Sequence, residues 1–183
     1  MGKMDLFFEQ RKRNTIRMHK HDYAGWGFYF ITIKTQGNRP LFGVINSSRV
    51  LLNEYGQIAE EEWKNTSGIR PEVRIDEFII MPDHLHGIVI IDPVNRLVRN
   101  LDKPDQIIPL VTPTGGIIKP QADSLASIMR GYKSAVSSRV YKIRHSTQPP
   151  IWQRNYYERI IRNAVELDNV RQYIRNNPAK WHP

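Results

Sequence analysis

The chain has 183 residues, with 27 lysines and arginines against 18 aspartates and glutamates, which gives a formal net charge of +9 at pH 7. Its length and its 40% content of hydrophobic residues predict a single globular domain over residues 1–183, and the absence of cysteine excludes disulfides and thiol catalysis. No apolar run approaches the ~20 residues of a membrane span, so we expect a cytoplasmic protein with no membrane partner, whose positive charge attracts a polyanion such as nucleic acid.

Residues 1–24 are expected to form a basic arm ahead of the first strand, with a solvated surface as the plain alternative to a nucleic-acid contact. Residues 26–35 are rich in β-branched and aromatic side chains and predict a strand, and 41–45 and 50–52 predict a short strand pair. Residues 53–66 are predicted to be a helix. The arm residues expected to contact DNA are Arg11, Lys12, Arg13 and Arg17.

Two histidines open the second arm of a predicted β-hairpin. Residues 73–81 and 85–91 alternate and then become apolar, and the Pro-Asp pair between them is a tight-turn signal. Because side chains alternate along a strand, His84 and His86 point to one face and Leu85 to the other. Two imidazoles held side by side supply half of a metal site, although surface histidines or structural hydrogen bonds would give the same pattern.

The residues beside the two histidines each have two interpretations. Asp83 could orient a histidine ring by accepting a hydrogen bond, or could simply belong to the turn, and we favour the turn. Gly87 could allow another part of the chain to approach closely, or could leave room for a phosphate, and the sequence does not decide between them.

The second half of the chain begins with residues 93–123, which show no periodicity and are expected to form a long loop. Residues 124–141 are predicted to be a helix with an apolar stripe, and residues 151–161 a strand. Asn163, with a glutamate three residues later, predicts the start of a last helix that Pro178 ends. Candidate contacts to DNA phosphates on the first of these helices and on the strand are Arg130, Lys133, Arg139 and Arg154.

The last predicted helix carries Tyr173 and Asn177 on one side, four residues apart, at the border of its apolar stripe. If this helix packs beside the histidine strand, the phenol and the amide oxygen can converge on one metal. From the residues alone, a packing tyrosine and a helix-end asparagine are the favoured interpretation. Tyr156 and Tyr157 are rival nucleophiles, although one of two neighbours on a strand must face the core.

The predicted elements follow one another as strand, short hairpin, helix, hairpin, loop, helix, strand and helix. Antiparallel strands with helices packed on one face give an α+β fold of the ferredoxin-like (RRM-like) type. The sequence has no phosphate-binding glycine loop, no HExxH and no GxSxG motif, so nucleotide-driven and serine-hydrolase functions lose support.

Three motifs taken together resemble the single-tyrosine HUH transposases, and especially their REP-associated tyrosine transposase branch. They are MPDHLHGIV around the histidines, WQRNYYERIIRN before the last helix, and YIRNNP within it. The resemblance covers about residues 11–178, and the loop at 93–123 is less typical of the family. The branch more often has asparagine where this chain has Asp83.

The resemblance implies a ferredoxin-like sheet on which His84, His86 and Asn177 hold Mg²⁺ or Mn²⁺ and Tyr173 is the nucleophile. It implies cutting and rejoining of single-stranded DNA that contains a hairpin, through a 5′-phosphotyrosine intermediate. The basic arm and the helix at 124–141 would neutralise DNA phosphates, and a homodimer is one assembly found among relatives. Two alternatives remain open: a non-catalytic DNA-binding regulator on the same fold, and a metal-dependent phosphodiesterase that uses water.

Overall fold

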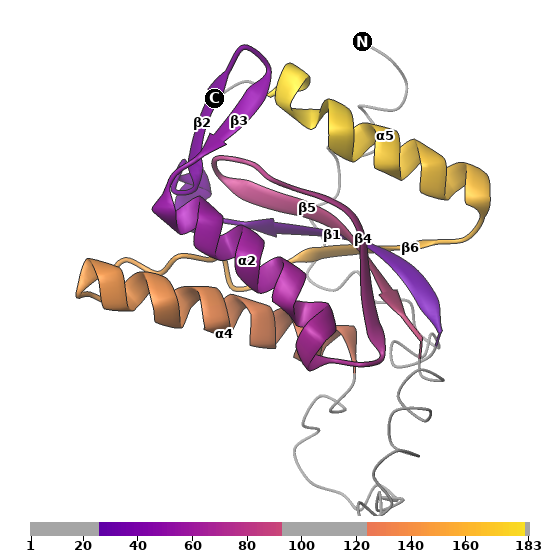
Figure 1. Ribbon diagram of the computed structural model, residues 1–183, viewed down its shortest axis with the longest axis horizontal. Coiled ribbons are helices and arrows are strands. Elements are labelled where there is room, and N and C mark those ends of the chain that lie inside the picture. The colour runs from indigo at the N-terminus through magenta and orange to yellow at the C-terminus, as the bar shows by residue number, and fades with distance from the viewer. Residues whose placement is uncertain (1–25, 93–123, 182–183) are drawn as a thin grey trace, which may run out of the picture.

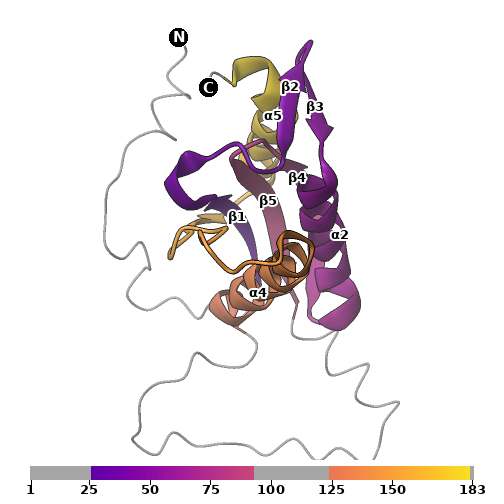
Figure 2. The same ribbon diagram turned by 90° about the vertical axis from the view of Figure 1, so that its left-hand side faces the viewer.

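The computed structural model describes residues 26–92 and 124–181. Its centre is a four-stranded antiparallel sheet in the order β4-β5-β1-β6, beyond which a separate hairpin of β2 and β3 projects (Figures 1 and 2). None of the helices in these two ranges is both long and apolar enough to cross a membrane. The strands are β1 (Gly27–Lys34), β2 (Gly43–Asn46), β3 (Arg49–Leu52), β4 (Val73–Ile80), β5 (His84–Ile91) and β6 (Tyr157–Ile161). The helices are the short η1 (Gln36–Asn38), α2 (Glu54–Ile69), α4 (Leu125–Arg144) and α5 (Ala164–Lys180).

The chain order β1-α2-β4-β5-α4-β6, combined with this strand order, is the ferredoxin-like arrangement. Strand β1 lies at the centre and runs antiparallel to both of its neighbours, β5 and β6. The α+β, ferredoxin-like class predicted from the sequence is therefore confirmed. The expected basic arm (1–24) and long loop (93–123) lie outside the described residues.

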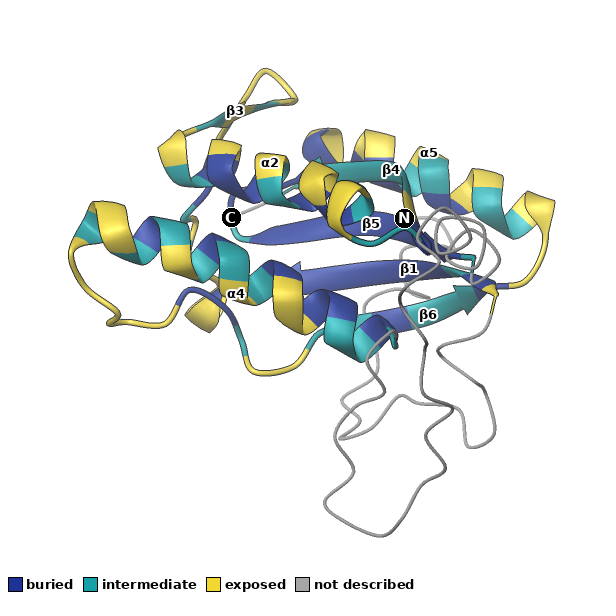
Figure 3. Ribbon diagram, turned by 60° about the horizontal axis from the view of Figure 1, so that its bottom comes forward, coloured by how far each residue is buried: buried dark blue, intermediate teal, exposed yellow. Residues whose placement is uncertain are grey.

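Helices cover both faces of the sheet, whereas the sequence led us to expect them on one face. Helices α2 and α4 pack on one face, against alternate residues of β1 such as Tyr29 and Ile31. Helix α5 packs on the other face, where Val170 and Ile174 belong to a cluster with Phe30. The central strands β1 and β5 are buried along almost their whole length (Figure 3), so apolar side chains on both of their faces need cover.

Strand β6 is shorter than predicted, since it begins at Tyr157 and not at residue 151. Before it, the carbonyl oxygens of Gln153 and Arg154 accept hydrogen bonds from Lys133 Nζ on α4, at 2.5 and 3.1 Å. The continuous ladder with β1 starts at Tyr157, and before it Trp152 forms an isolated antiparallel bridge with Thr35, just beyond the end of β1.

Helix α5 begins as predicted and ends later than predicted. Asn163 is its N-cap and accepts a hydrogen bond from the backbone N–H of Glu166 (2.8 Å). The helix then continues through Pro178 to Lys180. Pro178 removes one backbone hydrogen bond, but the helix ends two residues later and no further turn depends on that bond. The helix therefore tolerates the proline.

At Gly87 on β5, helix α2 packs closely against the sheet through the side chain of Trp63. A Cβ atom at Gly87 would lie 2.5 Å from Trp63 Cζ2, and the Trp63 side chain is fully buried. The side of the strand that Gly87 presents is opposite to that of His86, because side chains alternate. Close approach is therefore the correct interpretation of this glycine, and room for a phosphate is the wrong one.

Replacing Gly87 by alanine is expected to lower the free energy of unfolding by about 1–3 kcal/mol, because the added methyl group must displace Trp63. Chemical denaturation followed by tryptophan fluorescence measures this change. Gly68→Ala on α2 is the matched control, since nothing lies within 4 Å of its added Cβ, and it should keep or slightly raise stability. Equal stability of the Gly87 variant and the wild type would contradict the described packing of Trp63.

Candidate active site

His84 and His86 lie side by side on β5, on the face of the sheet that α5 covers. The strand register places His84 opposite Lys34 and His86 opposite Thr32 on β1, which confirms that the two histidines share a face. Their ring centroids are 4.5 Å apart, and both residues are buried, with exposures of 9% and 6%. A central strand, not a loop, therefore fixes the distance between the two imidazoles.

Each histidine ring is oriented by a hydrogen bond at its Nδ1 atom. His84 Nδ1 donates to Asp83 Oδ1 (2.6 Å), and His86 Nδ1 shares a hydrogen bond with Thr32 Oγ1 (2.8 Å). Asp83 also accepts from Trp181 Nε1 (3.3 Å), so its carboxylate orients a ring, and the turn-only interpretation favoured from the sequence is wrong. The Nε2 atom of His84 is buried and has no hydrogen-bond partner within the described residues.

The electrostatic environment keeps His86 neutral and Asp83 ionised. Burial, together with the influence of His84 and Lys34, lowers the pKa of His86 well below 6.5. A neutral imidazole can offer a lone pair to a cation, whereas a protonated one cannot. Burial opposes ionisation of Asp83, but the hydrogen bonds from His84 and Trp181 outweigh it and lower the pKa of this carboxyl group.

Tyr173 on α5 reaches the histidines of its own chain. Its hydroxyl oxygen lies 3.4 Å from His86 Nε2, and the centroids of the two rings are 5.2 Å apart. The ring also packs edge to face against Phe30, at 5.9 Å between centroids. Asn177 is buried on the same helix, one turn beyond Tyr173. Core packing, favoured from the residues alone, explains the position of the Tyr173 ring but not the approach of its hydroxyl to His86.

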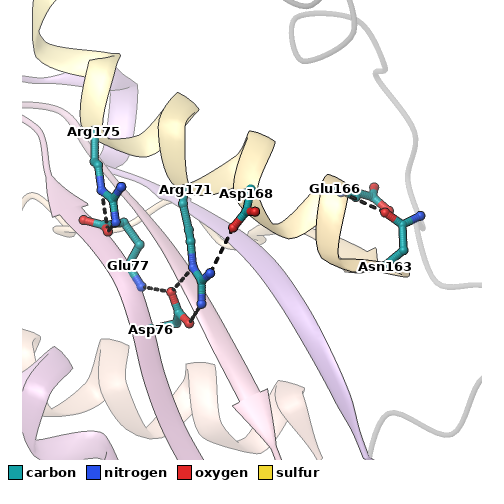
Figure 4. A network of polar contacts seen from close by, with 7 residues as sticks. All are labelled: Asp76, Glu77, Asn163, Glu166, Asp168, Arg171 and Arg175. Atoms are coloured by element: carbon teal, nitrogen blue, oxygen red, sulfur yellow. Dashed lines mark hydrogen bonds and ion pairs between the residues drawn. The ribbon is translucent and has the colours of Figure 1, made fainter.

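Two arginine–carboxylate pairs hold α5 on the sheet (Figure 4). Arg171 donates to both carboxylate oxygens of Asp76, at 2.8 and 2.6 Å, and Arg175 donates to Glu77 at 2.7 Å. Asp76 and Glu77 are neighbours at a bulge in β4, and the bulge allows consecutive side chains to reach the same helix. These four residues are called the α5 clamp below.

No family model matches the sequence. A search of curated proteins finds an uncharacterized protein of Haemophilus influenzae that is 38% identical over 169 residues, which are 92% of this chain and 89% of that protein. The chain belongs to the family of this protein. Among solved structures, a REP-associated tyrosine transposase bound to a REP hairpin is similar, with a TM-score of 0.54 and 20% identity over 90% of this chain and 74% of that chain. At this identity the likeness shows a shared fold.

In this member of the family, three side chains have the chemistry of metal ligands. They are the imidazoles of His84 and His86 and the amide of Asn177, which together offer two nitrogens and an oxygen to a divalent cation. Within the described ranges, no group of three or more histidine, cysteine or acidic side chains could hold a metal, and this donor set contains only two such side chains, the histidines. The Nε2 atom of His84, which is buried and has no partner among residues 26–92 and 124–181, fits a ligand position, because a buried nitrogen without a partner is otherwise costly.

The cations predicted to contact DNA differ in their exposure and in the groups that they contact. Helix α4 covers the sheet face opposite to the histidines. On it, Lys133 donates to two backbone carbonyls, and Arg139 is paired at 2.7 Å with two glutamates of α2, whereas Arg130 is exposed. Arg154, before β6, is also exposed. Outside the described residues lie Arg11, Lys12, Arg13 and Arg17.

Sequence reasoning missed Thr32 and Lys34, which lie beside the histidines, and the hydrogen bond from Trp181 to Asp83. The roles of Thr32 and Trp181 depend on pairing between distant segments, and no local signal marks them. The position of Lys34 gave a weak sequence signal, since it is a cation at the end of a strand and lies on the same face as Thr32.

Proposed function

We propose that this protein is a metal-dependent endonuclease and strand transferase for single-stranded DNA, of the single-tyrosine HUH type and its REP-associated branch. The observation that carries the proposal is the Tyr173 hydroxyl, which lies 3.4 Å from His86 Nε2 within one chain. A nucleophile beside a buried histidine pair, in which burial keeps His86 neutral, is an arrangement suited to phosphoryl transfer to a tyrosine.

The residues that would hold the metal are His84, His86 and Asn177, and Mg²⁺ or Mn²⁺ are the ions proposed. When bound, such a cation polarises the scissile phosphate and offsets the negative charge that develops on it. Asp83 and Thr32 fix the orientation of the two imidazole rings through their hydrogen bonds.

In the proposed reaction the Tyr173 oxygen attacks the scissile phosphorus and the bond to the 3′ oxygen breaks. The phenol proton passes to water, and the departing 3′ oxygen takes up a proton to become a free hydroxyl. One phosphodiester replaces another, so the bond energy is retained in the 5′-phosphotyrosine and rejoining needs no nucleotide. A 3′-hydroxyl of the same or another strand then reverses the step.

The proposed substrate is single-stranded DNA that folds into a hairpin. The net charge of +9 and the likeness in fold to a protein bound to a REP hairpin support this choice. Tyr173 meets His86 of its own chain, so a homodimer is not needed to bring the nucleophile to the histidines.

Incubating the protein with labelled hairpin-containing single-stranded DNA and Mn²⁺ tests the proposal against its two alternatives. A protein–DNA adduct that survives denaturing electrophoresis is the expected result. Cleavage without an adduct would favour the phosphodiesterase that uses water. Binding without cleavage would favour the non-catalytic regulator.

Replacing Asp83 by alanine is expected to weaken Mn²⁺ binding by about 10- to 100-fold, because His84 loses the acceptor that orients its ring. Titration calorimetry of the metal-free protein with Mn²⁺ measures the affinity. Trp181→Phe is the matched control, since it removes the other hydrogen bond to Asp83 and leaves the His84 contact. Unchanged Mn²⁺ affinity in the Asp83 variant would show that the carboxylate does not support a metal ligand.

A further inference from the structure

The sheet face that carries the histidines extends beyond the part that α5 covers. Helix α5 packs over Phe30, Ile88 and Ile161, with Tyr157 at the border of the same cluster. At the end of β1, the register places the exposed Lys34 opposite His84, and it places Thr32 between His86 on one side and Tyr157 on the other. Neighbouring strands are about 5 Å apart, so these groups form a continuous row beside the candidate active site.

Lys34 brings a positive charge to this row. Its side chain is exposed, and the strand register sets Lys34 directly opposite His84, so its charge lies beside the site. A second exposed cation, Arg154, follows Gln153, whose backbone N–H donates to the Lys34 carbonyl (2.9 Å). Lys34 therefore places a positive charge next to the place where a phosphate is expected, and Arg154 is a second exposed cation near the end of β1.

Tyr157 brings an aromatic ring to the same row. It is half-buried and meets Phe30 edge to face, with 6.3 Å between the ring centroids. Thr32 lies between Tyr157 and His86 in the sheet, so Tyr157 is about two strand spacings from His86. An unpaired base of a DNA strand that passes the histidines can reach the Tyr157 ring at this distance. Aromatic rings bind such bases by stacking.

We propose that Lys34 binds the phosphate next to the scissile one and that Tyr157 stacks on an unpaired base of the same strand. The DNA then crosses the ends of β1 and β6, and not helix α4, whose cations lie on the opposite face. This inference rests on the proposed function and assigns two of its substrate contacts.

Fluorescence anisotropy with the hairpin DNA, measured over a series of salt concentrations, tests the role of Lys34. Lys34→Gln is expected to lower the affinity roughly fivefold near 0.1 M salt and to reduce the slope of log K against log salt by about 0.7. Lys34→Arg should retain both. Lys142→Gln, an equal charge loss at an exposed position of α4, should change neither.

An abasic scan of the DNA tests Tyr157. One abasic position should lower the affinity of the wild-type protein by roughly 5- to 150-fold, the range expected for a stacked base. Tyr157→Ala should show the same loss with intact DNA and no further loss with that abasic DNA, and Tyr157→Phe should behave as wild type. If the alanine variant does not fold, the scan on the phenylalanine and wild-type proteins still locates a stacked base.

The proposal is overturned if Lys34→Gln binds as wild type, if Arg130→Gln loses affinity in its place, or if no abasic position matters. These outcomes are separate from the fate of the proposed function. A wild-type protein that forms the adduct while Lys34→Gln binds normally refutes only the strand path, whereas tight binding without any adduct refutes the chemistry.

Discussion

Replacing Tyr173 by phenylalanine is expected to abolish the covalent protein–DNA adduct and to slow cleavage by roughly 10⁴-fold or more, as removal of a covalent nucleophile does. The phenylalanine ring can keep the contacts with His86 and Phe30, because only the hydroxyl is lost. The contact between the hydroxyl and His86 Nε2, at 3.4 Å, is too long to contribute much stability, so the thermal midpoint should hardly change. Denaturing electrophoresis of labelled DNA after reaction with Mn²⁺ gives the readout.

Tyr156→Phe and Tyr157→Phe are the matched controls for this result. Tyr156 packs against the core on the α2 and α4 side, and Tyr157 lies across Thr32 from the histidines. Both variants should form the adduct. If either loses the adduct while Tyr173→Phe retains it, the nucleophile has been assigned to the wrong tyrosine.

Local periodicity was enough to predict the parts of the site that one element carries. Alternation along a strand puts His84 and His86 on one face, and a spacing of four residues puts Tyr173 and Asn177 on one side of a helix. The same reasoning predicted the cap at Asn163 and the class of the fold. These features depend on a residue and its near neighbours, which is what a sequence pattern contains.

The relations between elements could not be predicted in the same way. The contact of Thr32 with His86 depends on the register of β1 against β5, which joins residues 54 positions apart. The sequence around Lys133 predicts a cation that faces solvent. In the structure its ammonium group instead donates hydrogen bonds to two backbone carbonyls that precede β6. The face on which α5 packs follows from apolar side chains on both sides of the central strands, and the local alternation of one strand does not reveal it.

The α5 clamp explains how a helix can hold a tyrosine at a fixed place over the sheet. At 100° per residue, Arg171 and Arg175 lie on one flank of the apolar stripe formed by Val170 and Ile174, and Tyr173 lies on the other flank. The apolar stripe alone permits the helix to roll about its axis. Two directional ion pairs on one flank restrict this rolling, and thereby fix the Tyr173 hydroxyl beside the histidines.

Asp76→Asn is therefore expected to lower the rate of adduct formation by about 10²-fold, the cost of misplacing a reacting group by about 1 Å, with DNA affinity unchanged. The free energy of unfolding at pH 7 should fall by about 1–3 kcal/mol, because Arg171 loses both of its charged acceptors on β4. Single-turnover kinetics and urea denaturation measure the two effects. Glu60→Gln, which breaks an exposed pair with Lys64 on α2, is the control and should change neither.

The pH dependence of stability distinguishes the contribution of the Asp76–Arg171 ion pair from that of side-chain packing. The hydrogen bond from Arg171, partly opposed by burial, holds the pKa of Asp76 below its ordinary value of 3.8. A depressed folded-state pKa stabilises the protein above the unfolded value, and this stability is lost as the pH falls through the folded value. The stability difference between wild type and Asp76→Asn should therefore be full at pH 7 and shrink below about pH 4. A stability difference that is the same at pH 7 and below about pH 4 would show that the charge of Asp76 does not stabilise the fold. A normal adduct rate in a destabilised variant would show that the clamp supports the fold without positioning Tyr173.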